Sequence, residues 1–169
     1  MILLGSAAAI RNNCLPAWRE GMAIADYDLV GTDDEFKALV AYFKGLGKHV
    51  LAHDRGVTHK AIRVADDYRT SERILIDWVT MAPESSRILD RLTDFDDGEV
   101  FGFPVRLASP LTQYVTKRAY GRFFDLEKIE KDVAHWRQMV ADEGLTLTPD
   151  HVALFKAIRA EYAERLNKA

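Results

Sequence analysis

Residues 26–30 read Asp-Tyr-Asp-Leu-Val and place two acidic residues inside a strand-like segment. Strands are depleted in aspartate, so two of them beside apolar residues need a specific reason. Alternate side chains of a β-strand leave on the same face, and Asp26 and Asp28 would therefore project side by side. Such a pair favours a cation, because Mg²⁺ commonly binds one or two carboxylates together with substrate phosphates. The same run also fits a loop that ends at Asp26 and a solvated strand edge that carries Asp28.

A second feature precedes this one, where an apolar run at residues 2–4 ends in Gly5-Ser6. The pattern predicts a buried strand followed by a helix over about residues 6–12. Glycine lets the backbone approach a ligand closely, and the Ser6 hydroxyl with the N–H groups of the helix start would face an anion. These are the requirements for holding a triphosphate, although a strand followed by a serine-capped helix is also common without any ligand.

A third acid stands in residues 74–79, which read Ile-Leu-Ile-Asp-Trp-Val. An ionised Asp77 among five apolar neighbours is costly to bury unless a cation or a partner compensates its charge. A metal ion is one such compensation. Pairing with an arginine such as Arg63 is the other.

The ordered set of Gly5-Ser6, then Asp26-x-Asp28, then Asp77 on a later strand resembles the signature of the polymerase-β-type nucleotidyltransferase superfamily. The resemblance covers about residues 1–107. It implies a metal-dependent enzyme that transfers a nucleoside monophosphate from an NTP, with ATP as the first choice, to an unidentified acceptor. The acceptor could be a nucleic acid, a small molecule or a protein.

The resemblance also implies the roles of the acids. Asp26 and Asp28 would hold two Mg²⁺ ions, which Mn²⁺ can replace, and Asp77 would complete the site that activates the acceptor. All three are thus expected catalytic residues and metal ligands, and Asp77 is also a candidate to take the acceptor's proton. Two alternatives stay open: an antitoxin-like enzyme that modifies a partner protein, and a noncatalytic nucleotide-binding module of the same fold.

Gly5, Ser6 and Lys117 are the expected nucleotide-binding residues. Lys117 is preferred because family members often carry a basic residue early in the helix that follows the catalytic sheet. Four further basic residues are candidates for the phosphates or the acceptor: Arg11, Lys60, Arg118 and Arg122. Residues 115–123 interleave basic and aromatic side chains, which fits either stacking on a base or a helix with one wet and one buried face.

The expected fold is α+β, with a small mixed sheet and flanking helices in a catalytic core at residues 1–108 and a helical tail at residues 109–169 packed on it. Further strands are predicted at 49–53, 58–64 and 73–80, with a strand pair or extended arm at 100–107. Helices are predicted at 33–46, 83–92, from 109 onward, 125–142, and from 148 nearly to the C-terminus. Thr32 and Glu35 have capping-box spacing for the first of these, and turns are predicted at Arg55-Gly56 and Asp97-Gly98.

Composition narrows the classes of partner. The chain has 169 residues, is 48% hydrophobic and carries a net charge of −3, so no global basic field draws it to nucleic acid. Cys14 is the single cysteine, which excludes an intrachain disulfide and favours a cytoplasmic location. No stretch approaches the roughly 18 apolar residues of a membrane-spanning helix, so no membrane association is expected.

Overall fold

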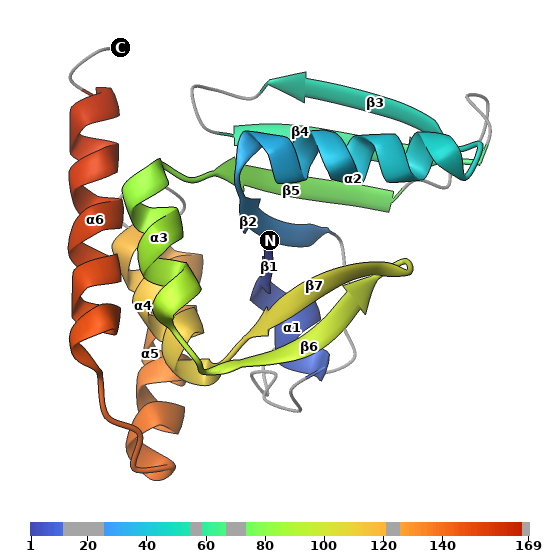
Figure 1. The fold of residues 1–169 in the computed structure, drawn as a ribbon. Coiled ribbons are helices and arrows are strands. Elements are labelled where there is room, and N and C mark those ends of the chain that lie inside the picture. Colours follow the sequence, from blue (N-terminus) through green and yellow to red (C-terminus); the bar gives the residue numbers. More distant parts are fainter. Residues whose placement is uncertain (12–25, 55–58, 67–73, 121–125, 167–169) are drawn as a thin grey trace.

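One mixed seven-stranded sheet carries the fold in the computed structural model (Figure 1). The structure describes residues 1–11, 26–54, 59–66, 74–120 and 126–166. The strands are β1 (Ile2–Leu4), β2 (Tyr27–Gly31), β3 (His49–Asp54), β4 (His59–Ala65), β5 (Ile74–Thr80), β6 (Phe95–Val100) and β7 (Phe103–Ala108). They lie in the order β3-β4-β5-β2-β1-β7-β6. Because β2 pairs in parallel with β5, the two strands predicted to carry acids are neighbours.

The helices are α1 (Gly5–Arg11), α2 (Asp33–Gly45), α3 (Pro83–Arg91), α4 (Pro110–Tyr120), α5 (Leu126–Asp142) and α6 (Pro149–Leu166). Helix α2 and the bundle of α3 to α6 lie in different places around this sheet, and α1 follows β1 directly (Figure 1). Helix α2 runs along β3, β4 and β5, whereas α3 to α6 gather as a bundle to one side of the sheet (Figure 1). The predicted α+β class is confirmed. Within the described residues, no helix combines the length and apolar character needed to cross a membrane.

Two hydrophobic clusters hold these layers together. The cluster between α2 and the sheet includes Leu3, Leu29, Leu39, Phe43, Ile62, Ile76 and Trp78. The other cluster joins the opposite face of the central strands to the helical bundle and includes Ile2, Leu4, Val30, Tyr114, Trp136, Leu154 and Ile158. Residues of α4, α5 and α6 therefore share a core with the sheet, while the division into a catalytic core and a helical tail at residue 108 stays a prediction.

Helix α2 begins with the predicted capping box. The Glu35 N–H donates to Thr32 Oγ1 at 3.2 Å, and the Thr32 N–H donates to Glu35 Oε2 at 2.8 Å. These two bonds satisfy backbone donors that have no partner within the helix. The helix ends before Gly47, whose φ of 74° is left-handed. The turn predicted at Arg55-Gly56 lies outside the described residues.

The turn predicted at Asp97-Gly98 is wrong, because both residues lie inside β6. The chain reverses instead at Phe101 and Gly102, which have φ values of 52° and 82°. Positive φ at two successive residues is typical of tight hairpin turns, since it matches the twist of the flanking strands. Packing explains why residue 98 is a glycine, because a Cβ there would lie 2.6 Å from Leu107 Cδ2. The Asp-Gly pair thus marks a close side-chain contact and no chain reversal.

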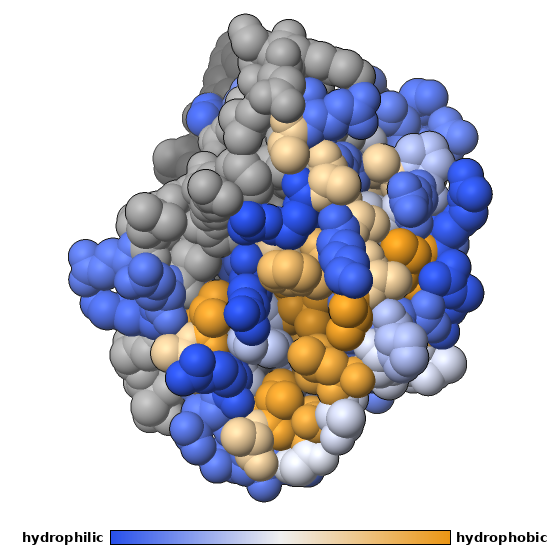
Figure 2. All heavy atoms as spheres, turned by 90° about the vertical axis from the view of Figure 1, so that its left-hand side faces the viewer, coloured by the Kyte–Doolittle hydropathy of each residue, from blue (hydrophilic) through white to orange (hydrophobic). Residues whose placement is uncertain are grey.

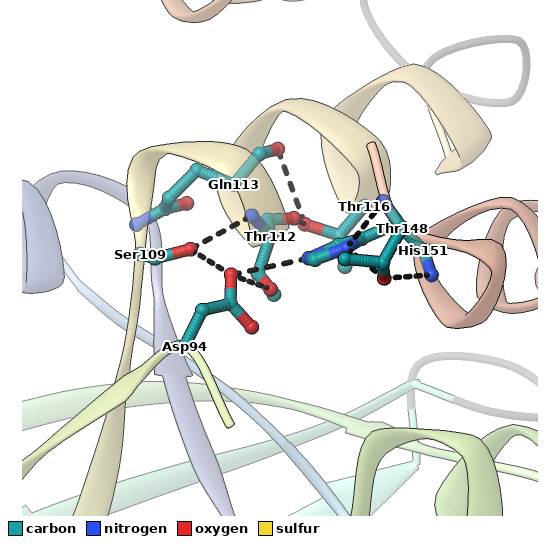
Figure 3. A network of polar contacts seen from close by, with 7 residues as sticks. All are labelled: Asp94, Ser109, Thr112, Gln113, Thr116, Thr148 and His151. Atoms are coloured by element: carbon teal, nitrogen blue, oxygen red, sulfur yellow. Dashed lines mark hydrogen bonds and ion pairs between the residues drawn. The ribbon is translucent and has the colours of Figure 1, made fainter. Parts of the chain in front are cut away.

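A polar network around Asp94 fixes the starts of two tail helices (Figure 3). Asp94 Oδ2 accepts hydrogen bonds from the Ser109 hydroxyl and from Thr112 Oγ1, the latter at 3.1 Å, and lies 3.1 Å from His151 Nε2. Thr148 Oγ1 lies 2.7 Å from the other ring nitrogen, His151 Nδ1. Burial raises the pKa of the Asp94 carboxyl, but the bonds from His151 and Ser109 outweigh it, and the pKa is lowered overall.

This lowered pKa predicts a loss of stability in acid. The folded Asp94 carboxyl binds a proton less readily than the unfolded one, so it stabilises the fold above about pH 4 and less as the pH falls further. We expect Asp94→Asn to lower the free energy of unfolding at pH 7 by about 1–3 kcal/mol, and this deficit to shrink at pH 3. Urea unfolding at pH 7, 5 and 3 measures it, with the exposed Asp97→Asn as the matched control. A deficit that stays constant across these pH values would contradict the assignment.

Candidate metal and nucleotide site

Three carboxylates from β2, β5 and the residue before β2 meet in one cluster. One carboxylate oxygen from each of Asp26, Asp28 and Asp77 lies within 4.8 Å of the other two. The β2–β5 register sets Asp28 directly opposite Asp77, and residues opposite each other on paired strands project to the same face. All three residues are half-buried. The structure therefore brings the sequence-predicted acids together, while their part in metal binding and catalysis stays a prediction.

The apolar neighbours of these acids decide which face the acids occupy. Leu29, Ile76 and Trp78 are each 0% exposed and belong to the cluster that packs under α2. Because side chains alternate along a strand, Asp28 and Asp77 must leave on the opposite face. Burial of the apolar residues thus sets the direction of the acids, and a one-residue slip of either strand would separate them.

A divalent cation fits this donor set chemically. Carboxylate oxygens are the ligands that Mg²⁺ prefers, and Mn²⁺ accepts the same hard oxygen donors. Three carboxylates so close together repel one another when all are ionised. A cation relieves this repulsion, so Asp26, Asp28 and Asp77 are the residues that would hold it.

Gly5 forms the turn between β1 and α1, directly against this cluster. Leu4, the last residue of β1, pairs with Asp28, and the following Gly5 has a φ of 67°. A Cβ on Gly5 would lie 2.0 Å from Asp28 Oδ2, so only glycine fits the turn on both grounds. The predicted change from strand to helix at this point is confirmed. Ser6 follows in α1, and its side chain lies outside the described part of the chain.

The basic residues that are candidates for binding the phosphates or the acceptor lie in different parts of the structure. Lys117 lies on α4, with Nζ 3.8 Å from Asp132 Oδ2 of α5. Lys60 forms an ion pair with Asp33 at the start of α2 and lies 4.5 Å from the centre of the Phe36 ring. It is therefore on the α2 side of the sheet, away from the acids. The Arg118 guanidinium donates to the Tyr114 hydroxyl at 2.6 Å, within the helical tail.

The other arginine candidates are Arg63, Arg11 and Arg122. Arg63 of β4 lies opposite Leu75 in the strand register, whereas Asp77 lies opposite Ala61. The Arg11 side chain and all of Arg122 lie outside the described part of the chain, as do residues 121–123 of the segment that interleaves basic and aromatic residues.

Gln113 of α4 was missed by the sequence analysis. It is 0% exposed, accepts a hydrogen bond from the Gly5 N–H at 3.1 Å and donates one to the Gly5 carbonyl at 3.3 Å. The Gly5 amide is thus engaged within the protein. The only sequence signal is a glutamine beside the apolar Tyr114 and Val115, and nothing in that pattern identifies a backbone partner 108 residues away.

Comparison with known proteins gave similarity only among solved structures; no family model and no curated protein matches the chain. The crystal structure of ANT(2″)-Ia in complex with adenylyl-2″-tobramycin is 18% identical, with 95% of this chain and 87% of that chain covered and a TM-score of 0.49. The solution structure of the antibiotic-resistance factor ANT(2″)-Ia is 17% identical, with 98% and 83% covered and a TM-score of 0.46.

An antigenic nucleotidyltransferase-like protein from Paracoccidioides brasiliensis is 15% identical, with 98% of this chain and 80% of that chain covered and a TM-score of 0.48. These three solved structures thus include ANT(2″)-Ia and a nucleotidyltransferase-like protein. At these identities and TM-scores, the case for an activity rests on the residues of this chain.

Proposed function

We propose that this protein is a metal-dependent nucleotidyltransferase, which moves a nucleoside monophosphate from an NTP to an acceptor. The observation that carries the proposal is the cluster of Asp26, Asp28 and Asp77, whose carboxylate oxygens lie within 4.8 Å of one another. The Gly5 turn packs directly against the Asp28 carboxylate of this cluster.

The three acids have different roles in the proposed transfer. Asp26 and Asp28 would hold Mg²⁺ or Mn²⁺, and the bound ion would supply charge stabilisation for the attacking and leaving oxygens. An acceptor oxygen forms a bond to the α-phosphorus of the NTP, and the bond to the bridging oxygen breaks, so that pyrophosphate leaves with the electron pair. Asp77 completes the acceptor side of the site and takes the acceptor's proton, directly or through water. Positioning and electrostatics thus account for most of the catalysis.

Radiolabelled NTPs test this activity directly. Each α-labelled NTP is incubated with the protein and Mg²⁺ or Mn²⁺, against panels of RNA, DNA, sugar phosphates, aminoglycosides and proteins. Mass spectrometry of the labelled product then names the acceptor class, and Asp28→Ala supplies the background. A product on a protein would favour the antitoxin-like alternative. Binding of Mg²⁺-NTP without any labelled product would favour the noncatalytic module and contradict the proposal.

Lys117 is the proposed phosphate-binding cation. It stands one helical turn after Gln113, on the face of α4 from which Gln113 reaches the Gly5 turn. We expect Lys117→Ala to weaken use of the NTP by about 10- to 100-fold, since it removes bonds to charged oxygens worth about 1–3 kcal/mol. Steady-state kinetics with varied NTP measures this. The control is Lys131→Ala, which removes an exposed lysine of α5; unchanged KM and kcat in Lys117→Ala would exclude Lys117 from the site.

A further inference from the structure

Gln113 is a buried polar side chain with an unusual pair of partners. Its carboxamide accepts from the N–H of Gly5 and donates to the carbonyl of Gly5, so both bonds go to a single residue of another element. A planar amide that engages both backbone groups of one residue restrains the position and the orientation of that residue. Burial strengthens this restraint, because neither backbone group finds water as a replacement partner.

The restrained residue touches the acid cluster. Gly5 adopts a left-handed φ of 67°, and its Cα faces Asp28 so closely that an added Cβ would lie 2.0 Å from Oδ2. A shift of the Gly5 turn toward β2 would push the Asp28 carboxylate, and a shift away would open space for it to rotate. The orientation of Asp28 therefore depends on where Gln113 holds Gly5.

Helix α4 is itself held firmly at the end from which Gln113 projects. Ser109 and Thr112 bond to Asp94, and the Thr112 N–H donates to the Ser109 hydroxyl at 3.0 Å. Figure 3 shows the Gln113 side chain leaving α4 on a different side from Thr112, which faces Asp94. The first turn of α4 is thus bonded to Asp94 on one side and to the Gly5 turn beside the acids on the other.

We infer that Gln113 is a positioning residue for the proposed nucleotidyl transfer: through Gly5 it fixes the Asp28 carboxylate in the orientation that binds the metal ion. This inference rests on the proposed function, because it assigns Asp28 a metal. Residues that orient a metal ligand through hydrogen bonds commonly change metal affinity or activity by about 10- to 100-fold when they are replaced. A buried glutamine that only satisfies backbone groups would change the stability of the fold and leave the metal affinity unchanged.

The decisive variant is Gln113→Met, which keeps the volume and removes both hydrogen bonds. The matched control is Thr116→Val on the next turn of α4, because Thr116 Oγ1 is buried and, among the described residues, bonds to the carbonyls of Thr112 and Gln113. Mn²⁺ affinity without nucleotide is measured by titration calorimetry, alongside thermal unfolding and kcat and KM for the NTP. Gln113→Asn is a second, milder variant, whose amide is one methylene too short to make both bonds, and it is used if Gln113→Met does not fold.

We expect Gln113→Met to weaken Mn²⁺ binding and lower kcat by about tenfold or more, while Thr116→Val changes neither and both variants lose comparable thermal stability. Equal Mn²⁺ affinity in Gln113→Met and Thr116→Val would overturn the positioning role and leave the proposed function intact. Absence of both Mn²⁺ binding and transfer in the unmodified protein would overturn the proposed function, and the inference with it. The two failures are therefore distinguishable in one set of titrations.

Discussion

Replacing Asp28 with alanine is expected to abolish metal binding and to reduce nucleotidyl transfer by about a thousandfold or more. Asp28 lies opposite Asp77 in the strand register and against the Gly5 turn. Its loss removes one of the three carboxylates that would hold the metal ion. Asp26→Ala is expected to have an effect of the same order, because Asp26 shares the strand face of Asp28.

The fold of Asp28→Ala is expected to survive, because the removal of one carboxylate relieves repulsion in the metal-free protein. The melting temperature without metal is thus expected to be equal to or higher than that of the unmodified protein. Asp96→Ala is the matched control, since it removes an exposed carboxylate of β6. Labelled transfer, Mn²⁺ titration and thermal unfolding are measured on all three proteins. Near-normal turnover in Asp28→Ala would rule out the catalytic interpretation of the cluster.

Local patterns predicted much of the fold and the identity of the acids. Thr32 and Glu35 define the start of α2 through chemistry confined to four consecutive residues, so their sequence spacing was sufficient. Asp28 and Asp77 stand out because each interrupts an apolar run, and burial of those runs forces the acids to the opposite face. Their mutual distance depends on β2 and β5 being parallel neighbours, which only the assembled sheet establishes.

Contacts between distant parts of the chain could not be predicted in this way. Gln113 and Gly5 are 108 residues apart, and nothing in either local sequence specifies the other. The charge of Lys60 makes it a phosphate candidate, but the sequence does not show which face of the sheet its side chain occupies. In the structure it lies on the α2 side, paired with Asp33. The Asp97-Gly98 pair predicts a turn locally, but Gly98 is needed because the Leu107 side chain of the neighbouring strand leaves no room for a Cβ, and a local pattern does not contain this contact.

Asp77→Asn is expected to separate nucleotide binding from chemistry. Asparagine keeps the shape of the side chain opposite Asp28 and removes its negative charge. If Asp26 and Asp28 suffice for the metal that accompanies the triphosphate, the variant binds Mg²⁺-NTP with an affinity close to that of the unmodified protein. Transfer is expected to fall by about a thousandfold or more, because the acceptor side of the site loses both a metal ligand and a proton acceptor.

Titration calorimetry with a nonhydrolysable NTP measures the nucleotide affinity, and an assay on the same sample measures transfer. Asp28→Asn serves as the comparison, because it is expected to lose both nucleotide binding and transfer. The two outcomes for Asp77 have different physical causes. Loss of transfer alone places the Asp77 charge in the step where the acceptor is activated. Loss of binding and transfer in equal proportion would instead make Asp77 part of the ground-state nucleotide site, and its assignment to the acceptor side would be wrong. Asp28 and Asp77 lie side by side on paired strands with carboxylate oxygens within 4.8 Å, so a comparison of their variants is needed to assign them separate roles.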